Sequence, residues 1–207
     1  DRTSRGLGDV YKRQTFRSMI RIGILGDIGS GKSYVAKSFG YPVFNADKVV
    51  GDLYKKDKKT FLKLKKILPK YFRSYPIKKE IVVKAVLANS SNLRKIVKVV
   101  HVEVRKKMNL FLKKNNKKKI VVLDIPLLLE NKISKKKDLL VFVQSKKVDI
   151  AKKLKKRINF NKGLVDKFRK LQLPLAHKKR MSNFIIKNDF TEKTVKKQVK
   201  VILKKIL

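Results

Sequence analysis

The chain has 207 residues, which suits a single domain with a buried core, and 43% of its residues are hydrophobic. Cysteine is absent, which excludes disulfides, cysteine-ligated metal sites and a cysteine nucleophile. The longest apolar runs span about five residues, whereas a membrane-spanning helix needs about 20. The sequence therefore predicts no membrane partner.

The chain is strongly basic, with 57 Lys and Arg residues against 15 Asp and Glu residues and a formal net charge of +42. Such a charge predicts attraction to polyanions. Because 46 of the basic residues are lysine, and arginine is the residue better suited to reading bases and clamping phosphates, the pattern favours a generally lysine-rich surface. A role in binding nucleic acid is the alternative.

The first 18 residues show no apolar period. Residues 9–14 read Asp-Val-Tyr-Lys-Arg-Gln and resemble the translation of a sequencing-library transposon adapter, whose codons are GAT GTG TAT AAG AGA CAG. We therefore expect residues 1–14 to be adapter-derived, residues 1–18 to be a non-native or disordered extension, and the natural chain to begin at Met19. A short natural extension is the alternative. Without these 18 residues the net charge is +39.

The first elements alternate between strand and helix. Residues 20–25 form a short apolar run bounded by glycine, which predicts a buried strand. A helix is expected at 32–39, a second strand at 42–45 and a helical region at 47–57. Between 58 and 114 the apolar residues recur at intervals of three and four, which predicts amphipathic helices. Pro69 and Pro76 are expected to separate them.

The second half continues the alternation. Uninterrupted apolar runs at 120–124 and 139–143 predict strands of a parallel sheet covered on both faces. Helices are expected at 148–159 and 163–172, a last strand at 184–187, and a final helix with Val195, Val199, Ile202 and Ile206 on its apolar face. This alternation predicts the α/β fold class.

Residues 26–33 read Gly-Asp-Ile-Gly-Ser-Gly-Lys-Ser and match the phosphate-loop pattern G-x-x-x-x-G-K-[ST], between an expected strand and an expected helix. Glycines let the loop curl so that backbone N–H groups face phosphate oxygens, and the helix N-terminus adds its dipole. Lys32 would reach the β- and γ-phosphates of ATP, and the Ser33 hydroxyl would ligate Mg²⁺. The residues expected to bind the nucleotide are Gly26, Asp27, Ile28, Gly29, Ser30, Gly31, Lys32, Ser33 and Tyr34.

Several segments in order make the chain, from residue 19 to 207, resemble the dephospho-CoA kinase family. The phosphate loop matches, with Asp27 where the family usually has a second Gly. The family's Asp-Ala-Asp corresponds to Asn45-Ala46-Asp47, and its Pro-Leu-Leu-Phe/Val-Glu corresponds to residues 126–130. A late family motif is matched at Gln172, Pro174, Lys178, Ile186 and Asn188, whereas Ser182 and Asn183 replace its Ala and Asp.

The resemblance implies a cytoplasmic phosphotransferase that moves the γ-phosphoryl group of ATP, with Mg²⁺, onto the ribose 3′-hydroxyl of dephospho-CoA in the last step of coenzyme A synthesis. It implies a three-layer P-loop fold of the nucleoside-monophosphate-kinase type with about five parallel strands. The expected division is a core of 19–57, 118–147 and 183–207, a helical CoA-binding insert of 58–117 and a lid of 148–182. A monomer or weak homo-oligomer without a specific nucleic-acid partner is expected.

Asp47 is the candidate catalytic base. A hydroxyl nucleophile needs a carboxylate that orients it and accepts its proton, and Asp47 follows the second expected strand, on the edge where open α/β sheets bind ligands. The alternative is that Asp47 caps the N-terminus of the following helix. Asn45 stands where the family has an acid and cannot accept a proton, which puts any Mg²⁺-linked role of that position in question.

Arg157 is the candidate lid cation, at the place where the family's lid carries arginines that close over ATP. Such a cation would stabilise the migrating phosphoryl group and exclude water. Lys153 stands where another Arg is usual and keeps the charge without the bidentate fork. A solvated basic helix face is the alternative for both residues.

Three further residues have less specific expectations. Asp124 ends the third expected strand and could support Mg²⁺ through water, or be structural. Glu130 could hydrogen-bond to the acceptor or cap a helix. His101 lies on the apolar face of its helix, where a core histidine is expected, and Val102 replaces the proline that the family has after it.

Two other functions remain open on the residues alone. A P-loop kinase with another acceptor, such as a nucleoside monophosphate, would keep the fold. A basic nucleic-acid-binding ATPase would use the net charge, although the aromatic residues are not interleaved with the basic runs as stacking would require.

Overall fold

The computed structural model describes residues 19–158 and 160–207. The predictions for residues 1–18 lie outside these residues. Within them, no helix is long and apolar enough to cross a membrane.

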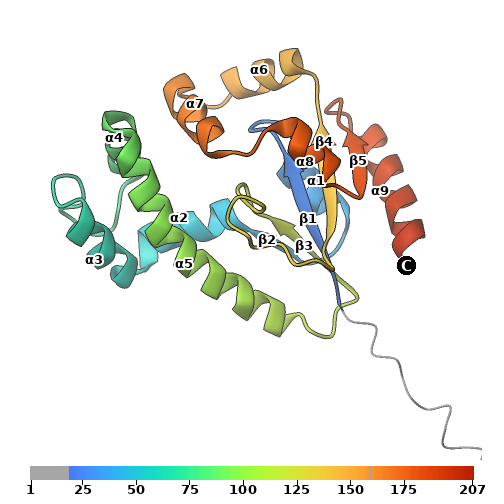
Figure 1. Ribbon diagram of the computed structural model, residues 1–207, viewed down its shortest axis with the longest axis horizontal. Coiled ribbons are helices and arrows are strands. Elements are labelled where there is room, and N and C mark those ends of the chain that lie inside the picture. The colour runs from blue at the N-terminus through green and yellow to red at the C-terminus, as the bar shows by residue number, and fades with distance from the viewer. Residues whose placement is uncertain (1–18, 159) are drawn as a thin grey trace, which may run out of the picture.

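A parallel sheet of five strands forms the centre of the described chain (Figure 1). Its order is β2-β3-β1-β4-β5. The strands are β1 (Ile20–Gly26), β2 (Val43–Asn45), β3 (Ile120–Asp124), β4 (Leu139–Gln144) and β5 (Phe184–Lys187). All four pairings are parallel. The predicted α/β class and number of strands are therefore confirmed, and the phosphate loop follows the central strand.

Helices connect the strands and cover both faces of the sheet. They are α1 (Lys32–Ser38), α2 (Ala46–Lys56), α3 (Lys58–Ile67), α4 (Lys79–Ala88), α5 (Ser90–Lys114), α6 (Lys147–Lys155), α7 (Lys162–Leu171), α8 (Leu175–Arg180) and α9 (Glu192–Ile206). In Figure 1, α3 and α4 lie farthest from the sheet, α5 runs back towards it, and α6 and α7 lie above it.

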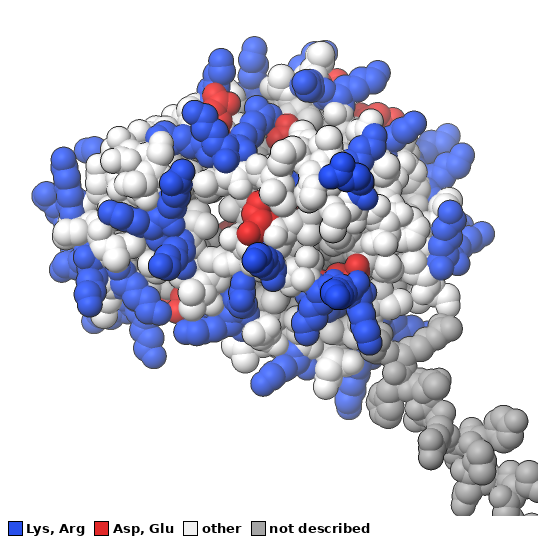
Figure 2. Space-filling view, in the orientation of Figure 1, with Lys and Arg blue, Asp and Glu red and all other residues white. Residues whose placement is uncertain are grey.

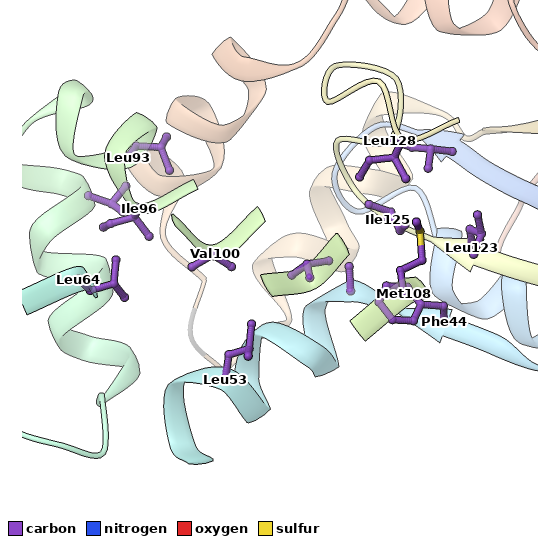
Figure 3. Packing of buried hydrophobic residues seen from close by; sticks show 14 of the residues in the cluster. Phe44, Leu53, Leu64, Leu93, Ile96, Val100, Met108, Leu123, Ile125 and Leu128 are labelled. Carbon is purple, nitrogen blue, oxygen red and sulfur yellow. The ribbon is translucent and has the colours of Figure 1, made fainter. Parts of the chain in front are cut away.

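Two apolar clusters hold these layers together because strand side chains alternate between the faces. Ile22 and Ile24 of β1 join residues of α1 and α9 on one face. Leu25 of β1 belongs to the cluster on the other face. Figure 3 shows that this second cluster extends from Leu123, in strand β3 of the sheet, through Val100 to Leu64 among the outer helices. The outer helices are thus packed onto the sheet through one continuous core.

Two details of the predicted elements differ from the structure. Helix α8 was not expected, because its six residues carry no apolar period and follow Pro174 directly. Helix α6 ends at Lys155, earlier than the predicted end at 159. Arg157, which the predicted helix would have included, therefore lies in the turn after α6. The division into core, insert and lid stays a prediction.

Candidate active site

The phosphate loop joins the carboxyl end of β1 to the N-terminus of α1 and is folded for close approach. Gly29 and Gly31 have φ values of 86° and 88°, in the left-handed region that favours glycine. A Cβ atom at Gly31 would lie 2.3 Å from the side-chain nitrogen of Asn188, and one at Gly29 would lie 2.8 Å from Leu154. The glycines therefore serve both the backbone turn and the packing beneath it.

Residues far along the chain hold this loop in place. The Ser30 carbonyl accepts hydrogen bonds from Asn188 Nδ2 at 2.8 Å and from Ser145 Oγ at 3.0 Å. Asn188 is buried, and its Oδ1 accepts a hydrogen bond from the Phe190 N–H. The late motif residue Asn188 is thus a structural support of the loop. Ser145 carries no motif signal of its own and was not predicted to be part of the site.

Lys32 is the first residue of α1, and its side chain turns back towards the phosphate loop. Its Nζ donates to the Asp27 carbonyl at 2.7 Å and to the Gly26 carbonyl at 3.3 Å. Burial lowers the pKa of Lys32 to about 8, an effect that nearby Asp124 opposes and nearby Lys178 reinforces. Its positive charge is therefore only partly present at pH 8 before a nucleotide arrives.

This lowered pKa predicts proton uptake when MgATP binds. Phosphate oxygens stabilise the charged ammonium, so Lys32 should gain about half a proton at pH 8 and almost none at pH 6.5, well below its pKa. The test is calorimetry of MgATP binding in two buffers with different enthalpies of ionisation. Lys32→Arg is the control, since arginine stays protonated. Equal uptake by the parent and Lys32→Arg at pH 8 would contradict the prediction.

Asp47 lies in the first turn of α2, but it is not the helix cap. The N-cap is Asn45, whose Oδ1 accepts a hydrogen bond from the Lys48 N–H at 2.8 Å. The capping alternative for Asp47 is therefore wrong, because the residue two positions earlier performs that function. The Asp47 carboxyl group is therefore not used to cap the helix.

The environment of Asp47 makes it a stronger base than an ordinary carboxylate. Desolvation raises its pKa, and Asp124 raises it further, while Lys32, Arg157 and Lys79 act in the opposite direction. These five side chains therefore share one electrostatic environment. Lys79, at the start of α4, was not predicted to be part of the site, because a single lysine among 46 carries no distinguishing signal.

Asn45 also organises the acidic side of the site. Its Nδ2 donates to Asp124 Oδ2 at 2.7 Å, and Asp124 is buried at the end of β3. An aspartate at position 45 could cap the helix but could not donate this hydrogen bond. The amide at Asn45 thus orients the Asp124 carboxylate without adding another negative charge beside Asp47.

One cavity of about 1770 Å³ brings these groups together. Its polar part is lined by Lys32, Ser33 and Tyr34 of the phosphate-loop end, with Asp47 and Asp124. Its apolar part lies between α4, α5 and α7. A space of this size with one polar and one apolar end can accommodate two substrates side by side.

The candidate lid residues occupy two different places. Arg157 lines the cavity and influences Asp47, in agreement with the proximity expected of it. Lys153 lies over the Phe190 ring, with its Nζ 5.2 Å from the ring centroid, and is not among the residues lining the cavity. Of the two candidate lid residues, the structure therefore places only Arg157 near the candidate base.

The donor groups in the cavity are compatible with Mg²⁺. Protein magnesium sites use one or two carboxylates, waters and substrate phosphates, and Ser33, Asp47 and Asp124 supply a hydroxyl and two carboxylates to the same cavity. The described residues contain no preformed group of three or more acidic, histidine or cysteine ligands. This set fits an ion that arrives with the nucleotide.

Glu130 and His101 have different surroundings from those expected. Glu130 forms a 2.6 Å ion pair with Lys178 and also accepts the Leu173 N–H at 2.9 Å, so it does not cap a helix. His101 is half-buried at the cavity wall, with a buried Nε2 that has no hydrogen-bond partner. Burial and nearby Arg105 lower its pKa, which favours the neutral imidazole.

The surface charge is spread widely. Figure 2 shows Lys and Arg side chains over the whole visible face without one dominant patch. This distribution agrees with a generally lysine-rich surface more closely than with a dedicated nucleic-acid groove on that face.

Comparisons with known proteins point to one family of kinases. The family model for dephospho-CoA kinase matches residues 20–194. A dephospho-CoA kinase of Wolbachia pipientis wMel is 37% identical over 187 residues, covering 88% of this chain and 95% of the relative. One of Bacillus anthracis is 31% identical over 193 residues, covering 89% and 96%.

Solved structures support the fold. A crystal structure from Thermus thermophilus has a TM-score of 0.74 at 23% identity and covers 92% of this chain and 99% of its own. A dephospho-CoA kinase from Campylobacter jejuni has a TM-score of 0.58 at 19% identity, with coverages of 90% and 96%. A shikimate kinase from Bacteroides thetaiotaomicron has a TM-score of 0.52 at 12% identity, with coverages of 91% and 99%.

Proposed function

The chain belongs to the dephospho-CoA kinase family, and from that premise we propose that Asp47, Lys32 and Arg157 carry the transfer of a phosphoryl group from ATP to the ribose 3′-hydroxyl of dephospho-CoA. The products are coenzyme A and ADP. The observation that carries the assignment of roles is the shared cavity, in which the phosphate loop and the Asp47 carboxylate face the same space.

Asp47 accepts the proton of the acceptor hydroxyl. Its pKa is raised by desolvation and by Asp124, so the carboxylate is a better proton acceptor than one in water. As the hydroxyl oxygen bonds to the γ-phosphorus, the bond from that phosphorus to the bridging oxygen of ADP breaks, and the proton moves to Asp47. The released ADP carries the electron pair of the broken bond.

Lys32 and Arg157 stabilise charge from two sides. Lys32 belongs to the rigid loop and can exchange its two backbone carbonyl acceptors for phosphate oxygens. Arg157 approaches from the turn after α6 and lines the same cavity. Fixed cations at these positions stabilise the charge that builds on the transferring group. Closure of this side over the nucleotide also excludes water, which would otherwise accept the phosphoryl group.

Mg²⁺ would be held by the Ser33 hydroxyl and, through water, by Asp124, with the phosphates completing its coordination. Such an ion neutralises the phosphate oxygens during transfer. Asn45 contributes by holding the Asp124 carboxylate in place.

The experiment is a phosphoryl-transfer assay of the full chain with ATP, Mg²⁺ and dephospho-CoA, in which product formation is followed by mass. We expect coenzyme A to form, and a 3′-deoxy analogue of dephospho-CoA to be inert. Turnover of shikimate or of a nucleoside monophosphate in preference to dephospho-CoA would refute the acceptor. ATP hydrolysis stimulated by DNA or RNA, without transfer, would favour a nucleic-acid-dependent ATPase.

A further inference from the structure

An acidic side chain lies inside the phosphate loop and is held by the helix opposite. Asp27 is the second residue of the loop, and both of its carboxylate oxygens face Arg169 of α7. Arg169 donates from Nε to Oδ1 at 3.2 Å and from a terminal nitrogen to Oδ2 at 3.0 Å. Oδ1 also accepts the Ile28 N–H at 2.7 Å. The carboxylate therefore has a defined orientation, and the contact is bidentate.

The charge of the loop explains why this contact matters for an oligophosphate. Between residues 26 and 33 the charged side chains are Asp27 and Lys32, which cancel each other. A triphosphate would therefore meet a loop without net side-chain charge, although its N–H groups remain. Arg169, which belongs to α7, adds one positive charge next to the phosphate loop.

The ion pair between Arg169 and Asp27 contributes little to the stability of the fold. The Arg169 side chain is 40% exposed, so solvent screens its end of the pair, and the less exposed Asp27 carboxylate, at 16%, keeps the Ile28 N–H as a donor without it. The other acid near Arg169 is Asp166, at 4.0 Å and with less direct geometry. The contact does, however, join α7 to the phosphate loop across 142 positions of sequence.

We propose that Arg169 is a positioning residue for the nucleotide, which neutralises Asp27 and fastens α7 over the phosphate loop so that ATP binds beneath it. The proposal rests on the proposed function only in that ATP is the ligand of the loop. The proposal implies that Arg169 matters for nucleotide binding only when Asp27 is present, because its charge offsets that of the aspartate.

The test is a double-variant cycle on the full chain. Arg169→Ala leaves the Asp27 charge beside the phosphates and should weaken MgATP binding about tenfold, a coupling of ordinary size. The KM for dephospho-CoA should stay within about twofold. Arg169→Lys keeps the charge but not the fork and should lose less affinity. In the Arg169→Ala background, Asp27→Gly removes the uncompensated charge and should recover most of the lost affinity.

Lys170→Ala is the matched control, because it removes the same charge from the next, exposed position of α7. It should leave MgATP binding unchanged, and thermal unfolding of Arg169→Ala should stay within about 2 °C of the parent. Calorimetry with MgATP alone measures these effects without the acceptor. A parent that binds MgATP but does not phosphorylate dephospho-CoA would therefore refute the proposed function and not this inference.

Three results would overturn the inference. The first is equal MgATP affinity in Arg169→Ala and Lys170→Ala. The second is a double variant that binds no better than Arg169→Ala alone. The third is a folded parent that binds no MgATP.

Discussion

Replacing Asp47 with Asn should lower kcat for phosphoryl transfer at least ~10²-fold, the usual contribution of a general base. The amide keeps the shape of the side chain but cannot take the proton of the hydroxyl. MgATP affinity should change much less, since the loop residues that bind the phosphates remain. Steady-state kinetics with both substrates, together with MgATP calorimetry, measure the two quantities separately.

The same variant should be at least as stable as the parent. The pKa of Asp47 is raised in the folded protein, which means that folding disfavours the ionised form. At pH 7, well above the unfolded pKa, the ionised carboxylate therefore lowers the stability of the fold, and a neutral amide removes this penalty. Loss of activity with retained or increased stability is the pattern of a functional group held at a cost to folding.

Asp52→Asn is the matched control for this experiment. Asp52 lies in the same helix, is largely exposed, and forms only a long 3.9 Å contact with Lys56. It should leave kcat and thermal unfolding nearly unchanged. If Asp47→Asn retained kcat within tenfold of the parent, or lost stability while Asp52→Asn did not, Asp47 would have a structural role instead.

Replacing Lys178 with Ala should be the most destabilising of these changes, by about 3–5 kcal/mol in the free energy of unfolding. Lys178 is 1% exposed, and its Nζ lies 2.6 Å from Glu130 Oε1. Without the lysine, the Glu130 carboxylate stays buried with the Leu173 N–H as its remaining donor. An uncompensated buried charge is far more costly than the loss of an exposed ion pair.

Urea unfolding of Lys178→Ala and of Lys179→Ala tests this prediction. Lys179 is the next residue of α8 and is exposed, so its variant should unfold near the parent midpoint. Replacing both partners, as in Lys178→Met with Glu130→Met, should recover much of the stability because no charge is left buried. A Lys178→Ala variant within about 1 kcal/mol of the parent would show that water reaches Glu130.

Some of the site could be predicted from the sequence because the signals are local. The glycine and lysine spacing of residues 26–33 is dictated by one loop and its phosphates, and the structure has the expected strand before it and helix after it. The cap at α2 is local too, yet the alternative that Asp47 forms it was wrong. Asn45 and Asp47 are both good capping residues, and which one caps depends on where the strand ends and the helix begins.

Other parts of the site depend on contacts that no local signal predicts, even where a residue such as Asn188 belongs to a motif. Ser145 and Asn188 support Ser30 from 115 and 158 positions away, and Arg169 reaches Asp27 from α7. A lysine-rich sequence hides Lys79, which looks like the other exposed lysines, and the late motif does not by itself show that Lys178 is buried. The charged groups near Lys79 and the burial of Lys178 distinguish these residues, and both are properties of the assembled layers.

The alternation of apolar runs, the glycine-rich loop and the order of the family motifs were sufficient by themselves to predict a sheet of about five parallel strands, most of its helices and the kinase family. They act through backbone geometry and side-chain period within a few residues. The tertiary structure alone decided which lysines are buried, which carboxylates share an environment, and which arginine faces the phosphate loop. Those outcomes depend on charges brought within a few ångströms by packing, where desolvation and pairing change their chemistry.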